Sequence, residues 1–228
     1  MGEALLWGLI AGSSLVLGGL IGLYVQLPSR WIGVIMAFGA GVLISAVAYE
    51  LVGEAVDTAA GGGGVGLGLF GGALTFFVGD ALIARLGGQD GEAAGGSALA
   101  IVLGTVLDGI PETAVLGLSL LTGEGVSVAV LAAVFLSNLP EAIAATSGLA
   151  AAGWTSGRVL GLWALVAAVC ALASLAGYVL LDGASPRTIA IVLAFAGGAV
   201  LTMLADAMMP EAFERGGKLA GVTSLGLV

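Results

Sequence analysis

Apolar residues fill most of the chain in long runs, which short polar or glycine-rich breaks separate. A helix needs about 20 predominantly apolar residues to cross a bilayer. We expect spans at residues 3–25, 31–52, 65–86, 98–122, 127–151, 158–181 and 188–210. Residues 218–228 supply about half of an eighth span, so we expect that span to be incomplete. The pattern predicts an all-α membrane protein with one transmembrane domain, residues 1–228, built as an eight-span helix bundle.

The composition excludes a soluble domain, because 59% of the 228 residues are hydrophobic, only 9% are charged and the mean hydropathy is +1.16. The formal net charge of −9 argues against nucleic acid as a partner and favours cations. No basic stretch precedes the first apolar run, so we expect a retained span in the lipid bilayer rather than a cleaved signal.

Basic residues are distributed unevenly among the loops. Five follow odd-numbered spans and therefore share one side of the membrane: Arg30, Arg85, Arg158, Arg215 and Lys218. Only Arg187 falls on the other side. Because short cytoplasmic loops carry the excess of Lys and Arg, this count predicts a multi-pass protein of the cell (inner) membrane with its N-terminus outside.

The fourth and fifth predicted spans carry polar residues near their middle. These are Asp108, Glu112, Asn138 and Glu141. Spacings of four and three residues put each pair on one helix face, and consecutive spans are antiparallel neighbours whose polar faces can meet. A proline precedes each glutamate, Pro111 and Pro140, and frees a backbone carbonyl of the preceding turn.

These intramembrane carboxylates favour a bound metal ion. Each costs about 2.5–3.5 kcal/mol on insertion scales, and neither span contains Arg or Lys to neutralise it. We therefore expect a divalent cation as transported substrate, held by Asp108, Glu112, Asn138 and Glu141, with no resident cofactor. Carboxylate and amide oxygens suit Mn²⁺, Fe²⁺, Mg²⁺ or Ca²⁺, and Zn²⁺ also accepts carboxylates.

An internal repeat favours a transporter. Residues 37–55 align without gaps on residues 194–212, at a constant offset of 157. The identical pairs include Gly41/Gly198 and Glu54/Glu211. The two segments lie five spans apart and so cross the membrane in opposite directions, which is typical of inverted-repeat, alternating-access transporters. A chance likeness between Ala- and Gly-rich helices is the alternative.

Further acids lie near the expected helix ends. Glu50 and Glu54 are expected at an outer entrance, and Asp80, Asp206 and Glu211 at an inner exit. Together they would line a cation path. Singly, each is equally well read as an ordinary interfacial residue.

The chain has eight apolar segments, a Pro-Glu step in both the fourth and fifth spans, and a helix-end Pro210-Glu211-Ala212. In these features it resembles the ZIP (Zrt/Irt-like) metal transporters, particularly their prokaryotic branch. The resemblance covers nearly the whole chain. It implies an eight-helix importer of divalent transition metals such as Mn, Fe or Zn, often homodimeric, with inverted three-helix repeats. It also implies that Glu112 and Glu141 are the central metal-bridging glutamates and that Asn138 is a ligand.

The chain departs from the family pattern at several positions. Asp108 stands where histidine is usual, Gly109 replaces an asparagine, and Ser137 stands where a longer ligand often occurs. The chain contains no histidine, so residues 87–97 replace a His-rich loop. With fewer ligands, we expect one bound ion rather than two.

Other functions fit some of the same residues. The acidic path would also serve protons or a small organic cation, and a non-transporting relative would use its acids only to hold two helices together. An intramembrane aspartyl protease would need Asp80 and Asp108 as its carboxylate pair, but the Gly-Asp step at residues 79–80 matches that motif poorly. We therefore expect no enzymatic activity.

Overall fold

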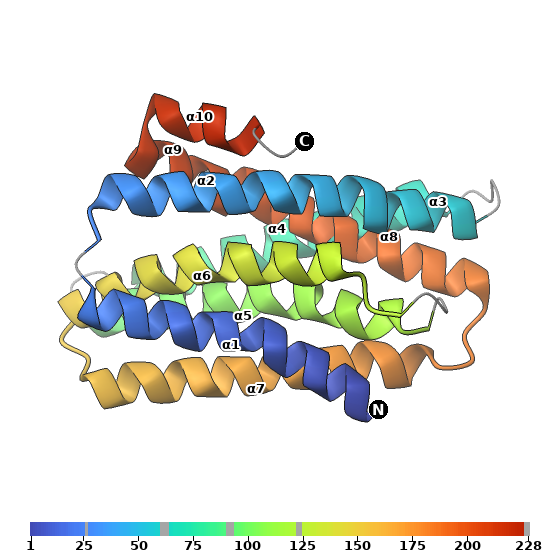
Figure 1. Cartoon of the computed structure of the whole chain (residues 1–228), viewed down its shortest axis with the longest axis horizontal. Helices are drawn as coiled ribbons and strands as arrows, with labels where there is room; N and C mark the ends of the chain where they lie inside the picture. Colours follow the sequence, from blue (N-terminus) through green and yellow to red (C-terminus); the bar gives the residue numbers. More distant parts are fainter. Residues whose placement is uncertain (26, 60–63, 90–93, 122–124, 226–228) are drawn as a thin grey trace.

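The computed structural model describes residues 1–25, 27–59, 64–89, 94–121 and 125–225, without the side chains of 86–89, 94–101 and 225. Residues 90–93 of the predicted loop 87–97 and the last three residues of the predicted eighth span therefore lie outside the described residues. Residues 87–89 and 94–97 are helical, so the predicted loop was too long. Within the described part, the secondary structure is helical and contains no strand. The helices run side by side along the long axis of the molecule (Figure 1).

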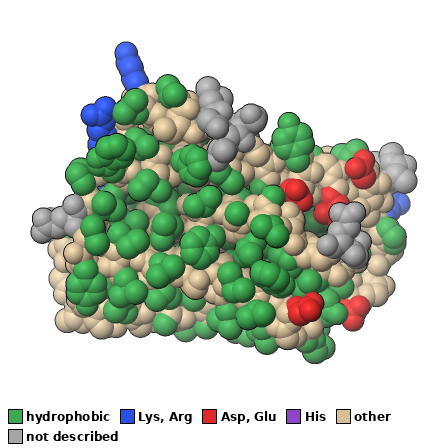
Figure 2. Space-filling view, viewed as in Figure 1, with side chains coloured by type: hydrophobic (Ala, Val, Ile, Leu, Met, Phe, Trp, Pro, Cys, Tyr) green, Lys and Arg blue, Asp and Glu red, His purple; other side chains and the backbone are tan. Residues whose placement is uncertain are grey.

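Seven helical segments within the described residues are long and apolar enough to cross a membrane, which makes this a multi-pass membrane protein. They are Gly2–Tyr24, Ser29–Thr58, Val65–Arg85, Val102–Ser119, Val128–Ala151, Ser156–Leu181 and Pro186–Gly216. Each predicted full-length span corresponds to one of them. Apolar side chains cover much of the face seen in Figure 2, as expected for a surface in contact with lipid.

The helices are α1 (Gly2–Tyr24), α2 (Ser29–Ala46), α3 (Glu54–Thr58), α4 (Val65–Gln89), α5 (Ala94–Ser119), α6 (Val128–Ala151), α7 (Ser156–Leu181), α8 (Pro186–Met203), α9 (Met209–Gly216) and α10 (Lys218–Leu225). Serine or threonine caps begin three of them. The side chains of Ser127, Thr155 and Ser185 accept backbone N–H groups at the starts of α6, α7 and α8. The described part of the eighth run is the short helix α10.

Two helices continue beyond their predicted ends through a π-helical segment. The segment η1 (Val47–Gly53) joins α2 to α3, and η2 (Leu204–Met208) joins α8 to α9. The predicted ends at residues 52 and 210 were therefore too early by six residues each. Each continuous helix of about 30 residues is about 45 Å long, so it exceeds the hydrocarbon thickness of about 30 Å and brings its terminal acids to the interface.

The repeat is visible in the backbone as well as in the sequence. η1 begins at Val47 and η2 at Leu204, which are separated by the same offset of 157 as the aligned residues. The packing is consistent with an extended repeat in which α1 is matched to α7 and α6 to α5, because α1 packs on α6 and α7 packs on α5. The repeated glycines share a role, because Gly41 lies against the backbone of Ser224 in α10 and Gly198 against that of Leu69 in α4. Neither position leaves room for a side chain.

Candidate metal path

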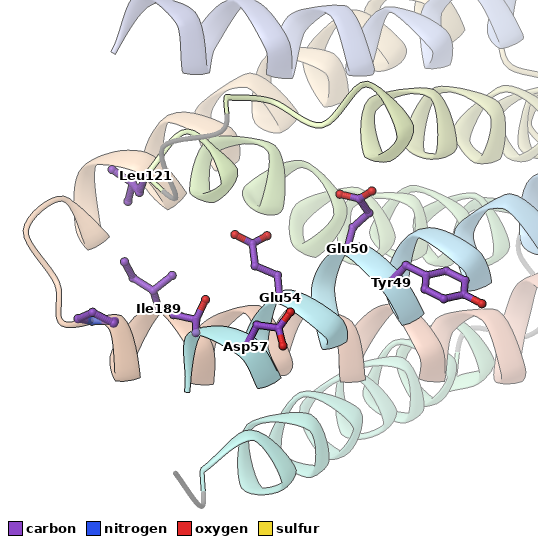
Figure 3. A pocket seen from close by; sticks show the side chains of 8 residues that line it. Tyr49, Glu50, Glu54, Asp57, Leu121 and Ile189 are labelled. Carbon is purple, nitrogen blue, oxygen red and sulfur yellow. The ribbon is translucent and has the colours of Figure 1, made fainter. Parts of the chain in front are cut away.

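Two cavities contain most of the candidate residues. The cavity at one end, which we call the acidic vestibule, has a volume of about 570 Å³. It is lined by Tyr49, Glu50, Glu54, Asp57, Thr58, Leu121, Pro186 and Ile189. In Figure 3 the carboxylates of Glu50 and Glu54 point to the same side of their helix, whereas the ring of Tyr49 points away. The predicted entrance acids therefore do share a cavity, and Asp57 joins them.

A second cavity of about 330 Å³ reaches the middle of the bundle, and we call it the deep cavity. It is lined by Asp80, Gly104, Thr105, Asp108, Glu141, Ala144, Ala145, Ser147, Gly148, Ala207, Glu211 and Arg215. It brings together two predicted metal ligands, Asp108 and Glu141, and two predicted exit acids, Asp80 and Glu211. Asp108 is close enough to Asp80 and Glu211 for their negative charges to repel one another. The charges of Asp108 and Glu211 likewise repel that of Glu141.

An apolar barrier separates the two cavities, and we call it the apolar seal. Around Glu112 it consists of Leu43, Ala46, Val47, Leu51, Val115, Val130, Val134 and Val200. The free space within it is about 10 Å³, which is no more than the roughly 10–15 Å³ that one water requires. Hydrated ions therefore cannot pass through the seal in this conformation.

The order of contacts along the helices shows that these three regions are consecutive. Along α5, Asp108 lines the deep cavity, Glu112 the seal and, just beyond the helix, Leu121 the vestibule. Antiparallel to it, α6 passes from Val130 in the seal to Glu141 in the deep cavity. At a rise of 1.5 Å per residue, Asp108 and Leu121 are about 20 Å apart along the α5 axis.

Glu112 and Asn138 are the buried members of the predicted ligand set. Glu112 is 2% exposed and Asn138 1%. Both carboxylate oxygens of Glu112 and Nδ2 of Asn138 lack a hydrogen-bond partner. Glu112 lies near Ser137, but that hydroxyl donates to the Val134 carbonyl at 3.0 Å. Buried polar groups without partners are rare. The two Glu112 oxygens are therefore candidates for binding a cation, whereas Nδ2 of Asn138 is an N–H donor and would need an acceptor instead.

The predicted four-ligand set is divided in this conformation. Asp108 and Glu141 face the deep cavity, whereas Glu112 lies one turn further along α5, in the seal. Within the described residues, no group of three or more Asp, Glu, Cys or His side chains stands close enough to hold one metal ion. The two carboxylates of the deep cavity together with bound water could hold a hard divalent ion, because such ions accept mixed protein and water oxygens.

The helices stay continuous through both prolines. Beside Pro111, the Gly109 carbonyl accepts the Thr113 hydroxyl at 2.6 Å and faces the Cys170 thiol at 4.0 Å. This carbonyl is thus occupied by side chains of α5 and α7, and Cys170 has a packing role. Sequence reasoning missed the neighbours Thr105, Ser147 and Arg215 of the deep cavity.

Two further acids and one cation could have been found by extending the repeat three residues. At the offset of 157, Asp57 corresponds to Glu214 and Thr58 to Arg215. Glu214 lines a third cavity of about 550 Å³, the α9 cavity, which shares Ala207, Glu211 and Arg215 with the deep cavity. Asp206, predicted at the exit, is exposed in η2 and does not line the deep cavity.

Comparison with models of known protein families gives no match, and a search of curated proteins finds no matching relative.

Proposed function

We propose that this protein transports a divalent metal ion across a membrane, in the manner of the ZIP transporters, through the path that joins the acidic vestibule to the deep cavity. The observation that carries the proposal is the state of Glu112. Its buried carboxylate has no hydrogen-bond partner, and it lies between two acid-lined cavities. Burying a carboxylate in that position costs free energy unless a cation binds to it. Asp108 and Glu141 bind the ion from the deep cavity, and Glu112 and Asn138 complete its shell when the seal opens.

The geometry supports alternating access. One cavity reaches the central acids, and the seal closes the other side. An inverted repeat allows the two ends to exchange these roles, because each half contains its own π segment at the equivalent position. The basic residues that follow odd-numbered spans lie at the α9 end, so we assign that end to the cytoplasm and the vestibule to the outside. Uptake through two paired copies stays a prediction.

Uptake of Mn²⁺, Fe²⁺ and Zn²⁺ into vesicles that contain the purified protein tests the proposal. Glu141→Gln removes one central charge at nearly constant shape, and we expect uptake to fall at least about 10-fold, as for loss of groups that support a metal. Glu3→Gln makes the same change on the exposed first turn of α1 and should leave uptake unchanged. Equal uptake in both variants would refute the assignment, and uptake of protons or an organic cation without any metal would favour the alternative cargo.

The deep cavity also supports a second candidate. Asp80 and Asp108 line it together and are close enough to interact, and a carboxylate pair is what an intramembrane aspartyl protease uses. Peptide cleavage that Asp80→Asn abolishes and chelators leave intact would establish this activity in place of transport.

A further inference from the structure

The turn between α6 and α7 holds one basic side chain stacked on one aromatic ring. The guanidinium carbon of Arg158 lies 3.7 Å from the ring centroid of Trp154, which is a cation–π contact. The backbone fixes both partners. Gly153 ends α6 with a φ of 82°, and the Trp154 N–H donates to the Leu149 carbonyl at 3.0 Å, as in a Schellman turn. Thr155 then caps α7 by accepting the Arg158 N–H at 3.4 Å.

The Arg158 guanidinium has no acidic partner. Its side chain is exposed and forms no salt bridge with any residue that the structure describes. Stacking covers one face of the guanidinium and leaves the N–H groups at its edge available. Arg158 also lies in the first turn of α7, where the partial charge of the helix is positive and an anion would be stabilised. The stacked pair is therefore positioned in advance for a negative group that the chain does not supply.

The depth of this pair matches the headgroup region of a bilayer. α7 has 26 residues and is about 39 Å long. The hydrocarbon core is about 30 Å thick, so about three residues at each end extend beyond it. Arg158 is the third residue of α7. The residues three, seven and fourteen positions later share its helix face. These are Gly161, which has open space around its Cα, and the exposed Leu165 and Leu172.

We propose that Arg158 and Trp154 bind the headgroup of an anionic phospholipid, whose acyl chains lie along the face formed by Gly161, Leu165 and Leu172. A guanidinium binds two phosphate oxygens at once, and tryptophan rings favour the membrane interface. A lipid fits better than a soluble phosphate because the apolar face continues into the membrane from the same residue. The basic residues of this end assign it to the cytoplasmic leaflet, which carries the anionic lipids. The inference does not depend on metal transport.

Native mass spectrometry of the detergent-purified protein tests the site by lipid titration. Phosphatidylglycerol and phosphatidylcholine with identical acyl chains differ in net charge, and we expect the wild type to bind phosphatidylglycerol more tightly. Arg158→Gln should weaken phosphatidylglycerol binding about 5-fold, the effect of about one basic residue at an anionic surface. Trp154→Leu keeps the charge but removes the stacking, and should weaken it about 2–5-fold. Neither change should alter binding of phosphatidylcholine.

The matched control is Arg30→Gln, which removes an exposed arginine at the start of α2, at the same end of the bundle (Figure 1). It should leave phosphatidylglycerol binding within about 2-fold of wild type, because charges beyond the Debye length are screened. Equal losses in the Arg30 and Arg158 variants would show only diffuse surface charge and overturn the site. So would wild-type affinity in Trp154→Leu, or equal binding of the two lipids by the wild type. Displacement of the lipid by inorganic phosphate would replace the lipid site with one for a soluble anion.

Discussion

Replacing Glu112 by leucine should make the metal-free protein more stable while it destroys the response to metal. The side chain is 2% exposed, lies among apolar residues of the seal and has no hydrogen-bond partner at either oxygen. A buried polar group without a partner costs about 1–3 kcal/mol. Leucine has no such group, fits among valines and leucines, and is a good helix former. We therefore expect Glu112→Leu to raise the free energy of unfolding by about 1–3 kcal/mol in chelator.

Thermal unfolding of the detergent-purified protein measures this change. For a chain of this size, 1 kcal/mol shifts Tm by about 2–4 °C, so we expect a rise of about 2–12 °C without metal. Mn²⁺ at 100 times its Kd should then stabilise the wild type by about 2.7 kcal/mol and leave Glu112→Leu unchanged. The stability difference between the two proteins should therefore shrink or reverse on adding metal.

Two control variants show whether the effect belongs to the carboxylate. Glu112→Gln keeps a polar group without a partner, so it should not gain stability, and it should lose the response to metal. Thr113→Val changes the next residue, whose hydroxyl is already bonded to the Gly109 carbonyl at 2.6 Å, and should gain no stability while keeping the response to metal. A Glu112→Leu protein that is less stable than the wild type in chelator, or one that Mn²⁺ stabilises equally, would refute the reasoning.

Three further changes test other parts of the structure. Thr146→Val removes the acceptor of the 2.8 Å hydrogen bond from Nε1 of the fully buried Trp163 and should lower unfolding free energy by about 1–3 kcal/mol, measured by thermal unfolding and tryptophan fluorescence. Gly198→Val forces a side chain into the backbone of α4 and should destabilise by about 1–3 kcal/mol or more in the same thermal assay. Glu54→Gln should raise the KM for Mn²⁺ uptake at low ionic strength and leave the maximal rate unchanged, whereas Glu3→Gln should do neither.

The outcomes that would contradict these predictions are distinct. Gly161 has open space around its Cα, so Gly161→Val should be tolerated, and an equal loss in both glycine variants would point to a general intolerance of valine. An unshifted tryptophan emission in Thr146→Val would mean that the indole finds another acceptor. A lower maximal rate in Glu54→Gln would place this residue in the transport step rather than in the attraction of ions.

The spans could be predicted because each is a long apolar run and a bilayer demands that length. The two helix extensions could not, since the residues after position 52 are acidic and small and the apolar run ends there. Whether a helix continues past such a point depends on neighbouring helices. α3 packs on α8, and α9 packs on α2, so tertiary contacts extend both helices. The π segments are also invisible to residue periodicity, although their matched positions follow the repeat.

In the candidate site, too, local sequence patterns predict some features, whereas the packing of the helices determines the others. Spacing predicted that Asp108 and Glu112 share a helix face, and the residue types predicted a cation. Residue spacing does not show how deeply each side chain lies within the bundle. The packing of α2, α6 and α8 determines where the deep cavity ends and the apolar seal begins. Asp80 belongs with Asp108 because α4 packs against α5. Arg215 escaped notice because a lone arginine near a helix end looks like an ordinary interfacial residue.

The twin π segments constrain how the chain tolerates insertion and deletion. A π turn accommodates one residue more than a regular turn. Deleting a residue from η1 would turn everything after it by about 100° around the helix axis. Glu54 and Asp57 would then leave the side of the helix that Glu50 occupies, while their counterparts at the other end stayed in place. The residue count of η1 therefore fixes the orientation of the vestibule acids, and that of η2 independently fixes the orientation of Glu211 and Glu214, so neither segment should tolerate the loss of a residue.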